Sequence, residues 1–204
     1  MQLKGQTFTY REFLEYSARL AKEGKTSGPD QEEPLIEYTA LNNKRMERID
    51  KHHELNDEFK AALDALDKPQ YWIVLTETWC GDSPQNIPTI GKAAEYAGDK
   101  IQLTIALRDE NTHLIDQFVP NQARAIPRLL IFDEEGNFIT HWGARPQPAQ
   151  EIIEKWKADP ENFPKDDANK QLQLWYNKDK QQTLQQELIE CLEKARLSKA
   201  KGEG

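Results

Sequence analysis

Residues 71–88 decide the fold and read Tyr71-Trp-Ile-Val-Leu-Thr-Glu-Thr-Trp-Cys80-Gly-Asp-Ser-Pro-Gln-Asn-Ile-Pro88. The run Tyr71–Leu75 is aromatic and β-branched and has the length of a strand, so it predicts a strand. A short turn follows, and Cys80 stands where a helix is expected to begin. Pro84 is compatible with the first turn of that helix, because first-turn amides have no partner within the helix.

Cys80 is the main candidate for chemistry. A thiol at the N-terminus of a helix meets the positive end of the helix dipole and unpaired N–H groups, which stabilise the thiolate. We therefore predict a reactive cysteine. The neighbouring Asp82 opposes a thiolate and makes Cys80 less acidic than a strongly activated thiol. The alternative is that Cys80 is a buried small hydrophobic residue, as cysteines after strands often are.

Three motifs in this order resemble the thioredoxin superfamily. Trp79-Cys80-Gly81-Asp82-Ser83, with Pro88 downstream, is similar to the Trp-Cys-Gly-Pro-Cys segment of that family and its helix-kinking proline. Ala125–Asn137, which contains Ile126-Pro127, resembles the cis-proline segment, strand and glycine-containing hairpin of the family. Gly143 falls where the family places the glycine that completes the substrate groove. The flanks 38–46, 107–111 and 143–146 resemble bacterial thioredoxin-like proteins with helical extensions.

The resemblance implies an α/β, three-layer thioredoxin-like fold, with a central mixed sheet between helices. We expect a thioredoxin-like domain at 68–158, an N-terminal helical extension at 1–67 and a C-terminal one at 159–204. Hydrophobic periodicity and turn residues predict the individual elements. Strands are expected at about 71–75, 101–107, 128–132 and 137–142, and helices at about 9–22, 35–66 with a break near 55–57, 80–97, 112–119, 148–157, 167–176 and 181–197. The helix at 148–157 is expected to turn Ile152, Ile153 and Trp156 inward.

The position of Ser83 departs from the dithiol members of the family, which have a second cysteine there. A hydroxyl cannot resolve a mixed disulfide, but it can donate a hydrogen bond to the Cys80 thiolate. Val74 also replaces the buried carboxylate of those members, and Glu77 is the nearest acid. The resemblance implies two catalytic residues, Cys80 and Ser83. The implied substrate-binding residues are Trp79, Gly81, Asp82, Ile126, Pro127 and Gly143.

Other chemical candidates are weaker. Arg128 either faces an anionic group of a substrate or pairs with a surface acid, and the second is the more common situation. Cys191 lies in an apolar stripe of a C-terminal helix, which favours a packing role over resolution of a disulfide at Cys80. The four histidines lack the spacing of metal ligands, so no metal site is predicted.

Composition restricts the partners. A net charge of −8 and a pI near 5.2 argue against nucleic acid or an anionic membrane surface. Two cysteines separated by more than a hundred residues make a disulfide framework unexpected and fit a reducing compartment, so we expect a cytoplasmic protein. The resemblance implies no bound cofactor; the expected partners are a disulfide-containing protein or low-molecular-weight thiol and an external reductant or reductase.

The leading hypothesis is monothiol thiol–disulfide exchange through Cys80. A non-catalytic protein-binding module that uses the groove between Cys80 and Pro127 is the main alternative, because a fold does not fix a function. A glutathione-transferase-like enzyme is a third possibility. The sequence Trp79-Cys80 fits redox chemistry better than that third reading.

Overall fold

The computed structural model describes residues 2–119 and 123–200, with side chains up to residue 195. The strands are β1 (Thr7–Phe8), β2 (Gln70–Thr76), β3 (Ile101–Leu107), β4 (Arg128–Phe132) and β5 (Phe138–Gly143). The helices are α1 (Tyr10–Glu23), α2 (Glu33–His52), α3 (Asp57–Asp64), α4 (Ser83–Ala97), α5 (Thr112–Phe118), α6 (Gln147–Ala158), α7 (Lys165–Asp179) and α8 (Gln182–Ala200), with a 3₁₀ turn at Gly98–Lys100.

The five strands form one mixed sheet in the order β1-β3-β2-β4-β5. The central strand β2 runs parallel to β3 and antiparallel to β4, so that Val74 faces Ile105 on one side and Leu129 on the other. Strand β1, which the sequence did not predict, pairs antiparallel with β3 through two residues. The mixed sheet with helices on both faces confirms the predicted α/β class.

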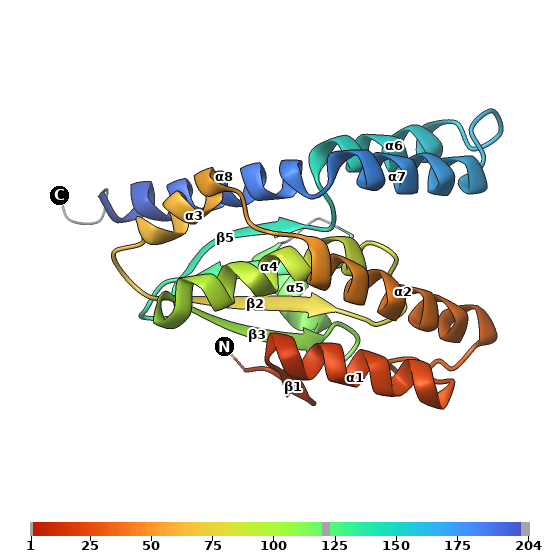
Figure 1. Cartoon of the computed structure of the whole chain (residues 1–204), viewed down its shortest axis with the longest axis horizontal. Coiled ribbons are helices and arrows are strands. Elements are labelled where there is room, and N and C mark those ends of the chain that lie inside the picture. Colours follow the sequence, from red (N-terminus) through yellow and green to blue (C-terminus); the bar gives the residue numbers. More distant parts are fainter. Residues whose placement is uncertain (1, 120–122, 201–204) are drawn as a thin grey trace.

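Helices cover the two faces of the sheet unequally (Figure 1). The largest apolar cluster lies on the face that α4 covers and also includes side chains from α1, α3 and α8. The other face packs against α5 through a smaller cluster that contains Ile73, Leu75, Leu130, Phe132 and Cys80. Alternate residues of β2 thus enter different clusters, as the two-residue period of a strand requires.

The C-terminal third divides into a hairpin and a core helix. Helices α6 and α7 form an antiparallel hairpin beyond β5, at the upper right of Figure 1. Ile152, Ile153 and Trp156 of α6 turn inward as expected, and the cluster that they enter is shared with α7 and is separate from the central core. Helix α8 lies against β5 and α3 instead, and its Leu184 and Leu188 belong to the main core.

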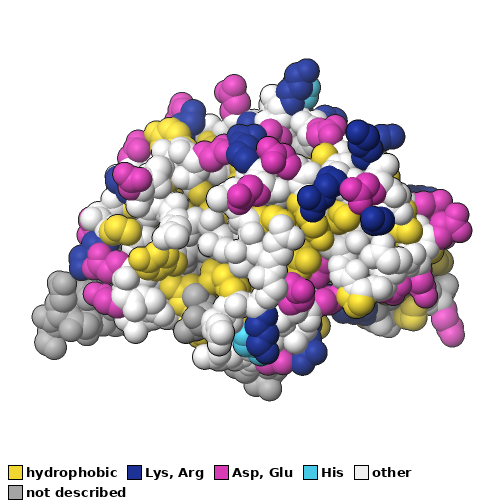
Figure 2. Space-filling view, turned by 90° about the horizontal axis from the view of Figure 1, so that it is seen from below, with side chains coloured by type: hydrophobic (Ala, Val, Ile, Leu, Met, Phe, Trp, Pro, Cys, Tyr) yellow, Lys and Arg dark blue, Asp and Glu magenta, His cyan; other side chains and the backbone are white. Residues whose placement is uncertain are grey.

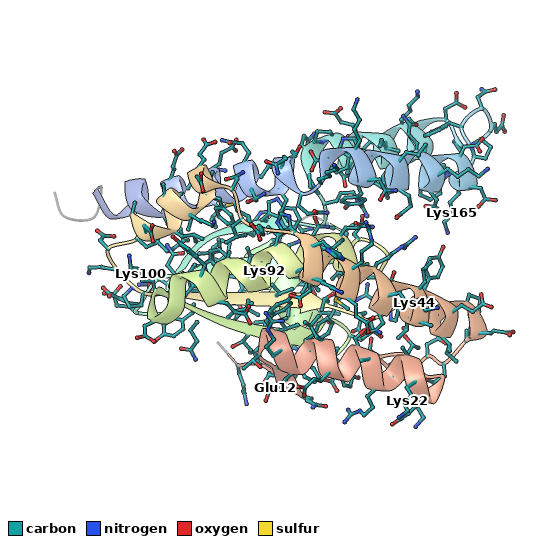
Figure 3. All side chains as sticks on the ribbon, viewed as in Figure 1. Glu12, Lys22, Lys44, Lys92, Lys100 and Lys165 are labelled. Carbon is teal, nitrogen blue, oxygen red and sulfur yellow. The ribbon has the colours of Figure 1, made fainter. Side chains whose placement is uncertain are left out.

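The N-terminal segment is held to the sheet by a well-formed helix start. Thr9 caps α1, and its hydroxyl and backbone exchange hydrogen bonds with Glu12, which forms the predicted capping box. Figure 3 shows Glu12 at the start of α1 and Lys22 near its end, an arrangement that complements the helix dipole.

The surface carries no single dominant charge in the view of Figure 2. Basic and acidic side chains alternate over that face, with hydrophobic side chains between them. Within the described residues, no helix is both long enough and apolar enough to cross a membrane.

Candidate active site

Cys80 lies in the turn that connects β2 to α4. Its amide donates to the carbonyl oxygen of Glu77 at 3.2 Å, and its own carbonyl oxygen accepts from the amide of Ser83 at 3.2 Å. The side-chain amide of Asn42, on α2, donates to the carbonyl oxygens of Thr78 at 2.9 Å and Cys80 at 3.0 Å. Helix α4 therefore begins at Ser83, three residues later than predicted, and α2 holds the turn in place.

The sulfur of Cys80 faces the segment that precedes β4. The thiol donates to the carbonyl oxygen of Ile126, with 3.2 Å between Sγ and the oxygen. The Ile126–Pro127 peptide bond is cis, and Ile126 and Pro127 are both buried. The structure thus brings together three of the predicted site residues from two parts of the chain 46 residues apart.

The environment of Cys80 favours the protonated thiol. Burial, followed by the charge of Asp82, raises the pKa of Cys80 from 9.0 to about 11. The side chain of Ser83 and the backbone amides of Asp82 and Ser83 act in the opposite direction, as predicted for the start of a helix. They do not offset burial, since only 7% of the residue is exposed. The opposing effect of Asp82 agrees with the expectation from the sequence, and the larger effect of burial is what the sequence analysis did not include.

Ser83 is fixed by a second hydroxyl. The Oγ atoms of Ser83 and Thr76 are 2.6 Å apart, and both residues are buried. This contact ties the first residue of α4 to the last residue of β2. It orients the Ser83 hydroxyl beside Cys80, where it lowers the pKa of the thiol.

Asp82 is the centre of a buried polar network. Its Oδ2 accepts from Arg145 Nη2 at 2.6 Å and Nε at 3.0 Å, and its Oδ1 accepts from the Tyr176 hydroxyl at 2.8 Å. The Asn86 side-chain amide donates to the backbone oxygen of Asp82 at 2.8 Å and to the Tyr176 oxygen at 3.2 Å. The residue beside the candidate nucleophile is thus joined to α7 and to the segment after β5.

Arg145 retains its charge in this network. Burial alone would lower the pKa of its guanidinium, but the charge and hydrogen bonds of Asp82 raise it above its usual value. Burial and the charge of Asp82 also raise the pKa of Tyr176 well above its ordinary value, so the phenol stays neutral and donates. The site therefore contains an ion pair with a phenolic donor on its far side.

Gly143 allows the backbone to approach Pro127. It pairs with Arg128 across β4 and β5 at a φ of 116°, a region that side chains disfavour. A Cβ atom at this position would overlap the carbonyl oxygen of Pro127. The residue expected to complete a groove thus lies directly against the predicted proline.

Arg128 is buried, which differs from the surface position that the sequence favoured. Its Nη1 donates to the carbonyl oxygen of Gly143 at 2.6 Å, and only 3% of the residue is exposed. Burial and the nearby Arg145 lower the pKa of its guanidinium to about 10. Arg128 therefore braces the end of the β4–β5 pair.

Trp79 and Gly81 form the more accessible part of the turn. Trp79 is half-buried, and the guanidinium of Arg108 lies 5.0 Å from the centre of its ring. Gly81 is half-exposed, and no atom beyond its chain neighbours lies within 4 Å of a Cβ placed there. These two residues are the exposed flanks of Cys80.

A buried network below the turn involves the N-terminal segment. Glu77 accepts from the Ser27 hydroxyl and, at 3.0 Å, from the amide of Asp109. Burial raises the pKa of Glu77. Thr78 and Ser27 exchange two further hydrogen bonds, at 2.9 and 3.0 Å. Because its carboxylate is engaged here, Glu77 has a structural part in the turn.

Cys191 is separate from this site. It belongs to the cluster on the other face of the sheet from that of Cys80, and burial raises its pKa to about 11. A packing role therefore describes it, as predicted. Over the described part of the chain, no three His, Cys, Asp or Glu side chains are grouped so as to hold a metal ion.

Sequence reasoning missed Arg145, Tyr176, Asn86 and Asn42. Arg145 follows Gly143 within a segment that resembled known proteins, but nothing in the pattern gave it a role. Tyr176 lies 94 residues from Asp82, and no local pattern connects them. The one available signal was chemical, because an aspartate at a helix start beside a buried strand needs a partner if it is itself buried.

Comparisons with known proteins agree with this geometry. The sequence model of the family described as thioredoxin matches residues 28–157. A protein of unknown function from Pseudomonas aeruginosa superposes with a TM-score of 0.58 at 18% identity, over 87% of this chain and 97% of that one. An HIV epitope scaffold superposes with a TM-score of 0.56 at 18% identity, over 86% and 96%. At these identities both structures show a shared fold alone. No curated protein matches the sequence.

Proposed function

Since the chain belongs to the thioredoxin family, we propose that it performs monothiol thiol–disulfide exchange with Cys80 as the nucleophile. The observation that carries this proposal is the 3.2 Å contact between the Cys80 sulfur and the carbonyl oxygen of Ile126, next to Pro127. It places a thiol against a segment whose backbone can also meet a substrate. Ser83 cannot act as a second thiol, which makes the exchange monothiol.

The first step forms a mixed disulfide. The Cys80 thiol loses its proton to a solvent base, and the thiolate attacks one sulfur of a disulfide in a protein or a small molecule. A bond forms between Cys80 and that sulfur, while the bond between the two substrate sulfurs breaks. The second substrate sulfur leaves as a thiolate and takes up a proton from solvent. No electron has yet been supplied from outside.

The second step needs an external thiol. The thiolate of this co-reactant attacks the substrate sulfur of the mixed disulfide, and Cys80 leaves as a thiolate. The external thiol becomes half of a new disulfide and is thereby oxidised. A second external thiol then attacks the external sulfur of this disulfide, which releases the substrate sulfur as a thiol and leaves a disulfide between the two external thiols. The net reaction therefore reduces the original disulfide and oxidises two external thiols, which a reductase can regenerate.

Deprotonation limits the first step. A thiol with a pKa of about 11 is ionised in only about one molecule in ten thousand at pH 7. Hydrogen bonds from Ser83 and from the helix amides stabilise the small ionised fraction. A low-pKa thiolate is a weaker nucleophile, so this rare thiolate is individually more reactive than one in an acidic site.

The direct test uses oxidised glutathione as the disulfide. Native protein is incubated with it, and intact mass and peptide mapping locate any glutathione adduct. We expect an adduct at Cys80 that glutathione removes, that Cys191→Ala retains and that Cys80→Ala lacks. If Cys80 of the folded protein forms no adduct while Cys80 of the urea-unfolded protein does, the exchange proposal is wrong.

The raised pKa and burial of Cys80 favour a second candidate function. In this reading the groove beside Cys80 and Pro127 binds an extended segment of a partner protein without chemistry. The decisive measurement is the rate of Cys80 alkylation by iodoacetamide against pH in the Cys191→Ala variant. Two results together support the binding module. The alkylation rate of Cys80 at pH 7 stays below one thousandth of the rate of free cysteine, and addition of a disulfide compound does not slow the alkylation.

A further inference from the structure

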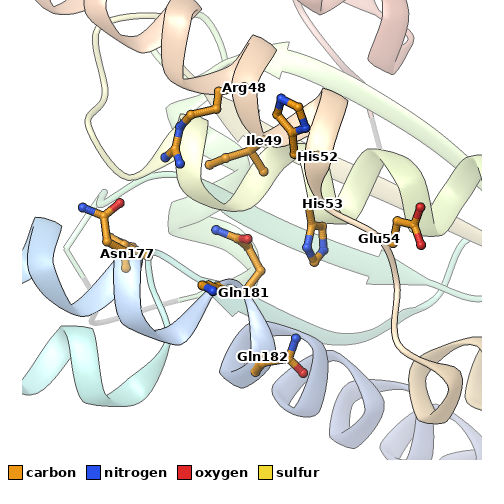
Figure 4. Close-up of a pocket in the computed structure, with 10 residues that line it drawn as sticks. Arg48, Ile49, His52, His53, Glu54, Asn177, Gln181 and Gln182 are labelled. Atoms are coloured by element: carbon orange, nitrogen blue, oxygen red, sulfur yellow. The ribbon is translucent and has the colours of Figure 1, made fainter.

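A cavity lies away from the Cys80 sulfur, between the end of α2 and the junction of α7 and α8. Its volume is about 530 Å³, within the range of small-molecule sites. Figure 4 shows Arg48 and His53 directed from α2 toward the junction, and Gln181 directed back from it. Lys180 and Gln181 make the sharp turn between the helices with φ values of 51° and 64°.

The charged side chains of this cavity are mostly basic. Arg48 and Lys180 line it, and neither side chain makes an ion pair or hydrogen bond with any described residue. Among the described residues that line the cavity, Glu54 is the one with a carboxylate side chain, and Figure 4 shows that side chain directed away from Gln181. Both cations are exposed, so their charged groups are free to reach a ligand at the mouth of the cavity.

Polar groups in the wall also lack partners. Gln181 lines the cavity, and its side-chain amide, which makes no hydrogen bond with a described residue, remains accessible to a ligand or to water. The Nε2 atom of His53 is buried and likewise has no hydrogen-bond partner there. A buried polar atom normally has a hydrogen-bond partner, so the Nε2 atom of His53 indicates a ligand or water in the cavity. Asn177 adds a further amide at the rim.

We propose that this cavity binds a small anionic molecule that carries phosphate or carboxylate groups. Arg48 and Lys180 neutralise the anion, while the Gln181 amide and the His53 ring orient it. Both acid groups accept hydrogen bonds from cationic and amide donors, which is the chemistry that this lining offers. The site is independent of thiol exchange, although Tyr176 contributes to its wall and also binds Asp82.

Isothermal titration calorimetry at constant ionic strength tests the proposal with three probes. Pyrophosphate represents the phosphate source, citrate the carboxylate source, and spermidine reverses the sign of the charge. We expect saturable binding of pyrophosphate or citrate, and whichever binds more tightly identifies the source. Binding of spermidine alone, or of none of the three, overturns the proposal.

Two charge-matched variants distinguish the cavity from general attraction. Arg48→Gln/Lys180→Gln removes both cations of the site, whereas Lys51→Gln/Lys178→Gln removes two exposed cations of the same helical region that lie outside the lining. The first variant is expected to weaken anion binding at least about tenfold, because it loses hydrogen bonds from charged groups. The second is expected to weaken it less than about twofold. Equal weakening by both overturns the proposal.

A third variant tests the orienting amide. Gln181→Ala keeps the charges of the cavity and is expected to weaken anion binding about threefold or more. Circular dichroism and urea unfolding establish that each variant is folded. Cys80→Ala leaves the cavity lining intact and is expected to retain anion binding. Anion binding can therefore be confirmed or refuted whether or not Cys80 performs thiol exchange.

Discussion

Asp82 and Arg145 form a buried ion pair directly beside the candidate nucleophile. Their side chains are 9% and 14% exposed, and the shortest distance between their charged atoms is 2.6 Å. Asp82 belongs to the active-site turn, whereas Arg145 comes from the segment after β5. The pair therefore connects the acidity of Cys80 to the packing of the C-terminal third of the chain.

Removal of the cation should destabilise the fold. Arg145→Gln leaves the Asp82 carboxylate buried without its counter-charge, and breaking such a pair typically costs about 3–5 kcal/mol. Urea unfolding measures the loss. Arg124→Gln, which breaks the exposed pair with Asp116, is the matched control and should leave stability almost unchanged.

The double variant tests the origin of that loss. Asp82→Asn/Arg145→Gln removes both charges, so it should be more stable than Arg145→Gln alone. A double variant as unstable as the sum of its two single variants would show that lost packing, not the unpaired charge, accounts for the effect.

Neutralising Asp82 should make Cys80 more acidic. Asp82 raises the pKa of the thiol, and Asp82→Asn also leaves the positive charge of Arg145 without its partner. Both changes favour the thiolate, so the pKa should fall below about 11. Absorbance of the thiolate against pH measures it in a Cys191→Ala background, where Cys80 is the single thiol.

Ser83→Ala should act in the opposite direction. It removes a hydrogen bond that lowers the pKa of Cys80, so the thiolate should become rarer and alkylation at pH 8 slower. The contact of Ser83 with Thr76 is lost as well, which is expected to cost about 1 kcal/mol of stability. Faster alkylation in Ser83→Ala than in its parent would contradict this assignment.

Gly143→Ala should disturb the site by steric overlap. The new Cβ meets the Pro127 carbonyl oxygen at a φ of 116°, so the backbone must shift, at a cost of about 2 kcal/mol or more. Gly81→Ala is the control, since its Cβ meets open space. Urea unfolding compares the two, and similar stabilities would show that Pro127 and Gly143 are not held this closely.

Stability should decline in alkaline solution. The pKa values of Cys80 and Cys191 rise from 9.0 to about 11 on folding, so the folded state binds more protons than the unfolded state in this range. The contribution of the two thiols to the free energy of unfolding is fully present below pH 9. It is lost as the pH rises through 9 and past 11, by about 3 kcal/mol for each thiol.

The tyrosines contribute to the same decline, so the measurement is a difference. Burial raises the pKa of both Tyr10 and Tyr176. The slope of unfolding free energy against pH between 9 and 11 is compared for the wild type and for Cys80→Ala/Cys191→Ala. A wild-type slope no steeper than that of the double variant would contradict the shifts in the two thiols.

Local sequence patterns predicted most elements because their signals are local. The aromatic and β-branched run Tyr71–Leu75, the capping box at Thr9 and the hairpin residues around Gly136 each act within a few positions. Strand β1 was missed because two residues carry no periodicity, and its pairing with β3 depends on chain folding.

The site was predicted only in part because its properties depend on distant residues. Cys80, Ser83, Ile126 and Pro127 were found together as expected. The sequence did not predict the acidity of the thiol, because burial outweighs the helix-start amides and burial depends on the whole fold. Arg145 reaches Asp82 across 63 residues, a separation at which no pattern in one sequence indicates a pair.

The position of α8 bears on how the chain acquires its structure during synthesis. Leu188 and Leu192 share a core with β5 and α3, although they are among the last described side chains. A ribosome that has released the chain only as far as α6 has therefore produced a sheet whose apolar face is covered by α1, α3 and α4 but still exposes the part that α8 covers beside β5. Such an intermediate is prone to aggregation. Nascent chains stalled before residue 184 should consequently recruit chaperones that full-length chains no longer need.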